Sequence, residues 1–131
     1  MVELYLQDGD SMKTKDELSV LLDALQKREE ILIKNQSVRK YNKYFDIMRK
    51  SAHAIIEQGR QSELLPYLES DSISIQRDVA GLLFNSYPNR CREVLTRISK
   101  MSVQKGLPKH LGNVRLSACD ALQYGIPKDF P

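Results

Sequence analysis

The sequence predicts an all-α fold, an α–α superhelix of about three helical hairpins, in one domain that covers residues 1–131. Residues 75–83 align with residues 114–122, and a fainter copy of the same pattern covers residues 47–55. The copies are 28 and 39 residues apart. Repeats of this length, with small residues inside an apolar helical pattern, are typical of stacked helical pairs that bury their apolar faces against their neighbours.

The first predicted repeat, about residues 14–58, contains two helices. Thr14 and Glu17 have the spacing of a capping box, and leucines then recur on one helical face up to about residue 34. The second helix is expected at about residues 37–58, because Gly59 stands where helices commonly end. Upstream of this repeat, residues 2–6 allow at most a marginal strand.

The second predicted repeat, about residues 61–86, starts with a short helix over residues 62–68. Pro66 lies close enough to the start of this helix that its missing backbone donor costs little. Asp71 and Ser72 are candidate N-caps for the helix that follows. This repeat is therefore expected to form the shortest of the three hairpins.

The third predicted repeat, about residues 88–124, has Pro88 in its first turn and ends its last helix at Gly125. A long loop at residues 102–110 joins its two helices, and it carries Lys105, Lys109 and His110. Long loops in compact domains are often functional, so this loop is a candidate binding site, and a connecting role without function is the alternative. A plain helical bundle whose helices align by chance is the alternative to the superhelix.

Composition and charge limit the class of protein. The chain is 41% hydrophobic and 28% charged, with a net charge of +3, so it is expected to fold without a membrane. Its first ten residues lack the basic start and apolar stretch of a secretory signal, which predicts a cytoplasmic protein. Basic and acidic blocks alternate along the chain, which argues against one continuous basic stripe for nucleic acid.

No residue pattern indicates catalysis or a cofactor. Cys91 and Cys119 lack the spacing of a metal or redox pair and are expected in the core. Neither His53 nor His110 has a nucleophile or carboxylate at a spacing that specifies an acid–base pair, and no nucleotide-binding or zinc-hydrolase motif is present. We therefore expect no enzyme, metal or cofactor. A helical-repeat DNA glycosylase is the main enzymatic alternative, but the chain has no Trp to hold a flipped base.

The repeat alignment also predicts a shared polar face on the second helices of the pairs, the face that usually lines the concave side of a superhelix. Charged residues of both signs with an aromatic edge suit a protein partner better than a phosphate backbone, and a solvated helix face without a partner is the alternative. The candidate partner-binding residues are Lys43, Asp46, Lys50, His53, Glu57, Asp78, Asn85, Asp120 and Tyr124.

Two segments carry a resemblance to a known family. Residues 64–68, then Asp71, then the run from Ile75 to Leu83 resemble a HEAT repeat, in which a proline-bearing first helix joins a second helix through an aspartate turn. Val114-Arg115 keeps the valine–arginine pair of that pattern, whereas Arg77 is displaced by one position. From Tyr41 onward the chain resembles small single-domain bacterial HEAT/armadillo-like proteins, some of which are similar to the immunity proteins of contact-dependent growth inhibition and other polymorphic toxin systems.

This resemblance implies a cytoplasmic immunity protein. Such a protein binds a cognate toxin domain, for example a nuclease, and neutralises it by steric and charge complementarity. The alternative is a HEAT-like adaptor or scaffold that binds another cytoplasmic protein, and a nucleic-acid-binding module is less favoured than either.

Overall fold

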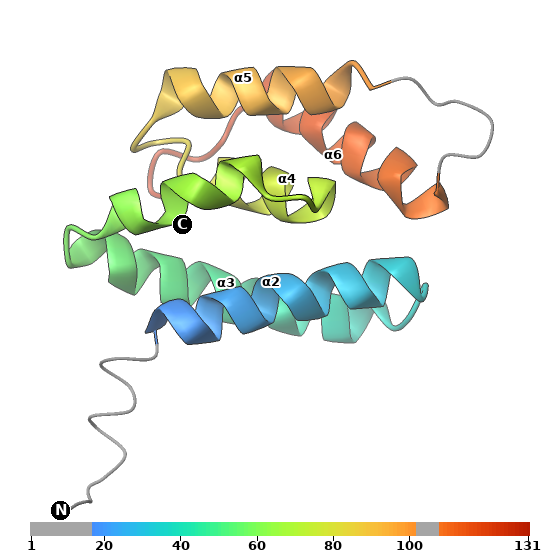
Figure 1. Cartoon of the computed structure of the whole chain (residues 1–131), viewed down its shortest axis with the longest axis horizontal. Coiled ribbons are helices and arrows are strands. Elements are labelled where there is room, and N and C mark those ends of the chain that lie inside the picture. The colour runs from blue at the N-terminus through green and yellow to red at the C-terminus, as the bar shows by residue number, and fades with distance from the viewer. Residues whose placement is uncertain (1–16, 102–107) are drawn as a thin grey trace, which may run out of the picture.

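The computed structural model describes residues 17–101 and 108–131 (Figure 1). Every regular element in these residues is a helix, which confirms the all-α prediction. The predicted cap at Thr14, the marginal strand at residues 2–6 and most of the loop at residues 102–110 lie outside the described residues. The arrangement of the hairpins as a superhelix stays a prediction.

The first pair consists of α2 (Glu17–Ile33) and α3 (Val38–Glu57). Ser37 caps α3, because its hydroxyl accepts a hydrogen bond from the backbone N–H of Lys40. After α3, Gly59 adopts a left-handed conformation with φ of 72°, which explains why the helix ends there. The two helices pack antiparallel along the lower edge of Figure 1.

The second pair consists of η1 (Gln61–Glu69) and α4 (Ile73–Leu82). The sequence predicts a short helix in the first segment, and η1 is a 3₁₀-helix that contains Pro66, whose ring nitrogen cannot donate to a carbonyl. Of the two candidate caps, Ser72 caps α4 by accepting a hydrogen bond from the N–H of Ile75. This pair occupies the middle layer of the molecule (Figure 1).

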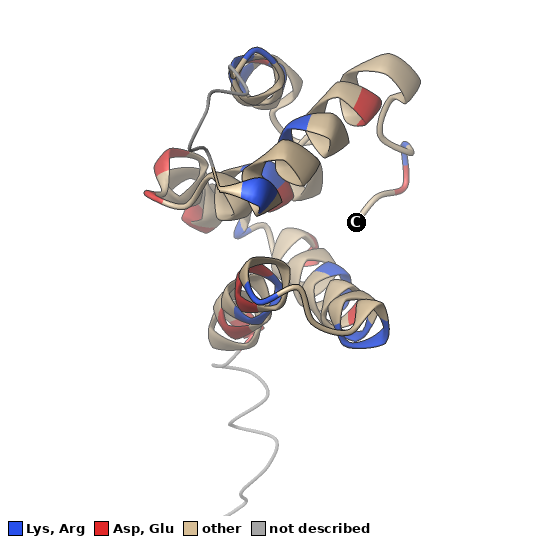
Figure 2. Ribbon diagram, turned by 90° about the vertical axis from the view of Figure 1, so that its right-hand side faces the viewer, with Lys and Arg blue, Asp and Glu red and all other residues tan. Residues whose placement is uncertain are grey.

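The third pair consists of α5 (Pro88–Ser99) and α6 (Lys109–Tyr124). The predicted loop at residues 102–110 ends two residues earlier than expected, because α6 begins at Lys109. Lys109 and His110 are therefore helical. Gly125, with φ of 83°, ends α6 and turns the chain back toward α3 (Figure 2).

One hydrophobic core joins the three pairs. Ala52, Ala80 and Ala118 are fully buried, as expected for small residues where helices approach closely. Cys91 is buried in this core and Cys119 is half-buried, and both are free thiols. The largest fully buried side chains are Leu21, Leu25, Met48, Ile55, Leu64, Leu68, Val79, Leu82, Leu83, Val94, Leu95 and Ile98.

Candidate functional site

A partly open cavity of about 270 Å³ lies where α2, α3, α4 and α6 converge. Residues 126–130, which follow α6, form one of its walls. Figure 2 shows this segment descending beside α6 on the side of α3. Apolar side chains line the cavity together with three neutral polar residues, Ser74, Asn113 and Ser117. Its charged residues are Arg28, Arg77 and Asp78. Concave sites with a few convergent polar groups are the usual form of a ligand site.

The first charged contact of the cavity is a buried ion pair between α2 and α4. The Arg28 Nη1 atom donates to Asp78 Oδ1 at 2.9 Å, and the two side chains are only 7% and 10% exposed. The Arg28 guanidinium also lies over the ring of Tyr41, 4.1 Å from its centroid. Asp78 Oδ2 and Arg28 Nε have no hydrogen-bond partner among the described residues. Burial raises the pKa of Asp78, and the charges of Arg28 and Arg77 oppose this rise.

Arg77 is the second cation of the cavity. Its Nε donates to Ser117 Oγ on α6 at 3.0 Å, and this is its only side-chain hydrogen bond to the described residues. Gly81, one turn further along α4, leaves room for the guanidinium, because a Cβ there would lie 2.8 Å from Arg77 Nη1. Burial lowers the pKa of Arg77, while the nearby charge of Asp78 raises it. The cavity therefore contains two guanidinium groups and one carboxylate.

Asn85 holds the wall formed by the segment after α6. Its Nδ2 lies within hydrogen-bond distance of three backbone carbonyls, those of Pro127, Lys128 and Phe130, at 2.9, 3.2 and 2.8 Å. The ring of Phe130 stacks on that of Phe45, with centroids 6.1 Å apart and an angle of 29° between the rings. The segment thus adds a ring to the cavity and covers part of α3.

The structure separates the nine residues that the sequence predicts for partner binding. Asp120 and Tyr124 are exposed on α6, Tyr124 by 77%. The expectation that Asp78 belongs to an exposed face is wrong, because its carboxylate is paired with Arg28 inside the cavity. The Asn85 side chain is occupied by the segment after α6. The other five lie along the outer face of α3: Lys43, Asp46, Lys50, His53 and Glu57.

The difference arises from the rotation of α3 about its axis. The repeat alignment places Asp46 beside Ser74 and Asn113, and Lys50 beside Asp78 and Ser117. The residues from α4 and α6 do line the cavity, but α3 turns Tyr41, Phe45 and Met48 toward it instead. A strip of apolar residues on α3 thus covers the cavity, and the charged strip faces outward.

The alignment also missed the two arginines of the cavity. Arg28 falls at helical spacing after Leu21 and Leu25, on the stripe that α2 buries. An arginine on an apolar stripe is a signal for a buried ion pair, because an unpaired charge there would be too costly. Arg77 appeared only as a displaced element of the repeat pattern.

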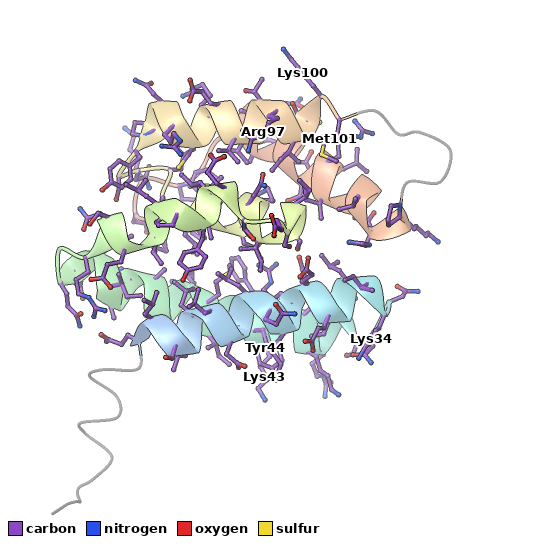
Figure 3. The ribbon with its side chains drawn as sticks, viewed as in Figure 1. Lys34, Lys43, Tyr44, Arg97, Lys100 and Met101 are labelled. Carbon is purple, nitrogen blue, oxygen red and sulfur yellow. The ribbon has the colours of Figure 1, made fainter. Side chains whose placement is uncertain are left out.

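We name the outer face of α3 the basic ridge, defined by Arg39, Lys43, Asp46, Lys50, His53 and Glu57. Its one ion pair in the described residues joins His53 Nε2 and Glu57 Oε2 at 3.3 Å, and the Asp46–Lys50 pair that helical spacing allows is not formed. Lys43 points away from α4, α5 and α6 next to Tyr44 (Figure 3), with its Nζ 5.7 Å from the centre of that ring. Within the described chain, Arg39, Lys43 and Lys50 form no ion pair, which leaves the ridge with a surplus of positive charge.

Comparisons and searches of the described residues assign no chemistry to the chain. No protein-family model, curated protein or solved structure matches it. Within residues 17–101 and 108–131, no three His, Cys, Asp or Glu side chains are placed to hold a metal ion. None of the helices in the described part of the chain is long and apolar enough to cross a membrane.

Proposed function

We propose that the chain is a binding protein without catalytic activity that acts in the cytoplasm as an immunity protein. Its partner is the toxin domain of a bacterial toxin system, and the complex neutralises the toxin by covering a functional surface. The resemblance of the repeat pattern to HEAT-like immunity proteins supports the class. The exposed basic ridge of α3 is the observation that supports the position of the interface.

The charges of the basic ridge indicate the chemistry of the partner surface. Arg39, Lys43 and Lys50 are not neutralised by acids of the described chain, so they are available to an acidic patch on another protein. Asp46 and Glu57 interrupt the positive charge, which suits a patterned protein surface better than a uniform phosphate backbone. The catalytic cleft of a nuclease is basic because it binds phosphate, so it would repel the basic ridge. The ridge therefore fits an acidic exosite of a nuclease toxin better than the catalytic cleft of that toxin.

A growth-protection assay tests this proposal. The neighbouring genes are first searched for a toxin domain. A domain found there is co-expressed with the chain, and its affinity for the chain is measured with the purified proteins. The double variant Lys43→Glu/Lys50→Glu is expected to weaken binding by about tenfold or more and to lose protection, because like charges then face the acidic patch. The matched control, Lys100→Glu/Lys128→Glu, makes the same charge change at two exposed lysines, one after α5 and one after α6, and is expected to protect fully.

Three results would contradict the proposal. Equal protection by the two double variants would exclude the ridge as the interface. A gene neighbourhood without a toxin, together with capture of another cytoplasmic protein that the ridge variant no longer binds, would favour the adaptor alternative. Nucleic acid that co-purifies with the wild type and is lost from the ridge variant would assign the surface to phosphate binding.

A further inference from the structure

The charges inside the cavity do not balance. Asp78 is paired with Arg28, and Arg77 forms no ion pair with the described residues. Only Nε of Arg77 donates a hydrogen bond to the described residues, so its two Nη groups have no acceptor among them. Neither Nη is among the fully buried polar atoms that lack a partner, so neither is completely closed off from the cavity. A desolvated guanidinium with unused donors is costly, and an anion that accepts from it removes that cost.

The arrangement of Arg77 favours a planar, singly charged anion. Ser117 occupies Nε, and the free edge formed by the two Nη groups matches the two oxygens of a carboxylate. One negative charge brings the three-residue cluster to neutrality. A phosphate dianion would exceed this and would add repulsion with the nearby carboxylate of Asp78, so the charge count favours a monocarboxylate.

The walls of the cavity favour an acid with an apolar body. Phe45, Met48 and Phe130 line it from α3 and from the segment after α6, and Leu32 and Val114 add aliphatic surface. Its volume of about 270 Å³ lies just below the usual range for ligand pockets, about 300–1,000 Å³. This size admits a small molecule with a single ring or a branched chain.

We propose that the cavity binds a small monocarboxylic acid with an aromatic or branched apolar body, whose carboxylate accepts hydrogen bonds from the two Nη groups of Arg77. Phe45 and Phe130 contact the apolar body, and Ser117 and Gly81 hold the guanidinium in place. This site lies on the opposite side of α3 from the basic ridge, and it does not depend on the toxin partner.

Titration of the purified chain with benzoate, phenylacetate and 4-methylpentanoate tests the site. Binding is followed by isothermal calorimetry and by amide chemical shifts, with 2-phenylethanol as the uncharged control and inorganic phosphate as the control anion. We expect at least one of the acids to bind, to shift the amide signals of Gly81 and Ser117, and to bind at least about tenfold more tightly than either control.

Three variants locate the anion. Arg77→Met removes the cation and is expected to abolish binding of the acid. Gly81→Ala keeps the charge but displaces Nη1, since the new Cβ would lie 2.8 Å from it, and we expect about tenfold weaker binding. Arg39→Met removes an exposed arginine from the basic ridge and is expected to bind like the wild type.

The proposal is overturned if none of the three acids binds, if 2-phenylethanol binds as tightly as phenylacetate, or if the Arg77 variant binds as well as the wild type. Thermal unfolding checks that each variant folds. Should Arg77→Met not fold, Gly81→Ala and Ser117→Ala keep the test decisive, because wild-type affinity in both would equally exclude the guanidinium as the anion site.

Discussion

The second helices of the first two pairs, α3 and α4, align in the sequence but occupy different environments. Six of the ten residues of α4 are buried, against four of the twenty of α3. The reason is their neighbours: α4 packs against η1, α5, α6 and α2, whereas α3 packs mainly against α2. A repeat pattern therefore predicts that a helix forms, but its burial depends on how many elements surround it.

Aligned charged residues consequently have different roles in the two helices. Lys50 of α3 is exposed, and its counterpart Asp78 in α4 is paired with Arg28 in the cavity. His53 is exposed, and its counterpart Gly81 is buried under the Arg77 guanidinium.

The largest effect is expected from the aligned pair Asp78 and Lys50. Asp78→Ala leaves the buried guanidinium of Arg28 and the partly buried guanidinium of Arg77 without their carboxylate, so we expect a loss of about 3–5 kcal/mol in the free energy of unfolding. Lys50→Ala removes an exposed, unpaired charge and is expected to change it by less than about 0.5 kcal/mol. Urea unfolding of both variants measures the difference. Similar small losses in both would mean that Asp78 is not part of a buried network.

Much of the fold could be predicted from local signals. Ser72 at the start of α4, Gly59 after α3 and Gly125 after α6 all act as the sequence predicts, because caps and left-handed glycines depend only on a few neighbouring residues. The 3₁₀ character of η1 is also a local effect, but helical spacing alone does not distinguish it from a short α-helix.

The site was less predictable, because it depends on contacts between distant segments. The pair between Arg28 and Asp78 spans fifty residues, and the Arg77–Ser117 bond spans forty. Asn85 contacts backbone carbonyls that lie 42 to 45 residues further along the chain. The rotation of α3 follows from the packing of its aromatic side chains on the cavity, and the charge spacing of the helix does not reveal it.

A smaller effect on stability is expected from the titration of Cys91, which is buried near the start of α5. Burial raises the pKa of the Cys91 thiol from 9.0 to about 11, against a weak opposing effect of Arg90. Between these values the unfolded chain has lost the thiol proton and the folded chain keeps it, so stability falls as pH rises through this window. The full loss is about 2–3 kcal/mol.

Unfolding of wild type and Cys91→Ala in guanidinium chloride at pH 8 and pH 11, under reducing conditions, isolates this thiol from the lysines and tyrosines that titrate in the same range. The difference in the free energy of unfolding between wild type and Cys91→Ala should change by about 2–3 kcal/mol, against the wild type, from pH 8 to pH 11. A constant difference between the two proteins would show that the Cys91 thiol has the same pKa in both states.

The smallest effect is expected at the His53–Glu57 pair of the basic ridge. Its 3.3 Å contact resembles the 2.9 Å contact of Arg28 and Asp78, but its side chains are 53% and 68% exposed, against 7% and 10% for the buried pair. Water and salt screen exposed charges, and both side chains lose rotamer freedom on pairing, so the contact adds little to stability. A double-mutant cycle of His53→Ala and Glu57→Ala at pH 6 should give a coupling energy below about 0.5 kcal/mol that decreases further in 1 M salt. A coupling above about 1 kcal/mol would mean that the outer face of α3 is more shielded from solvent than its exposure indicates.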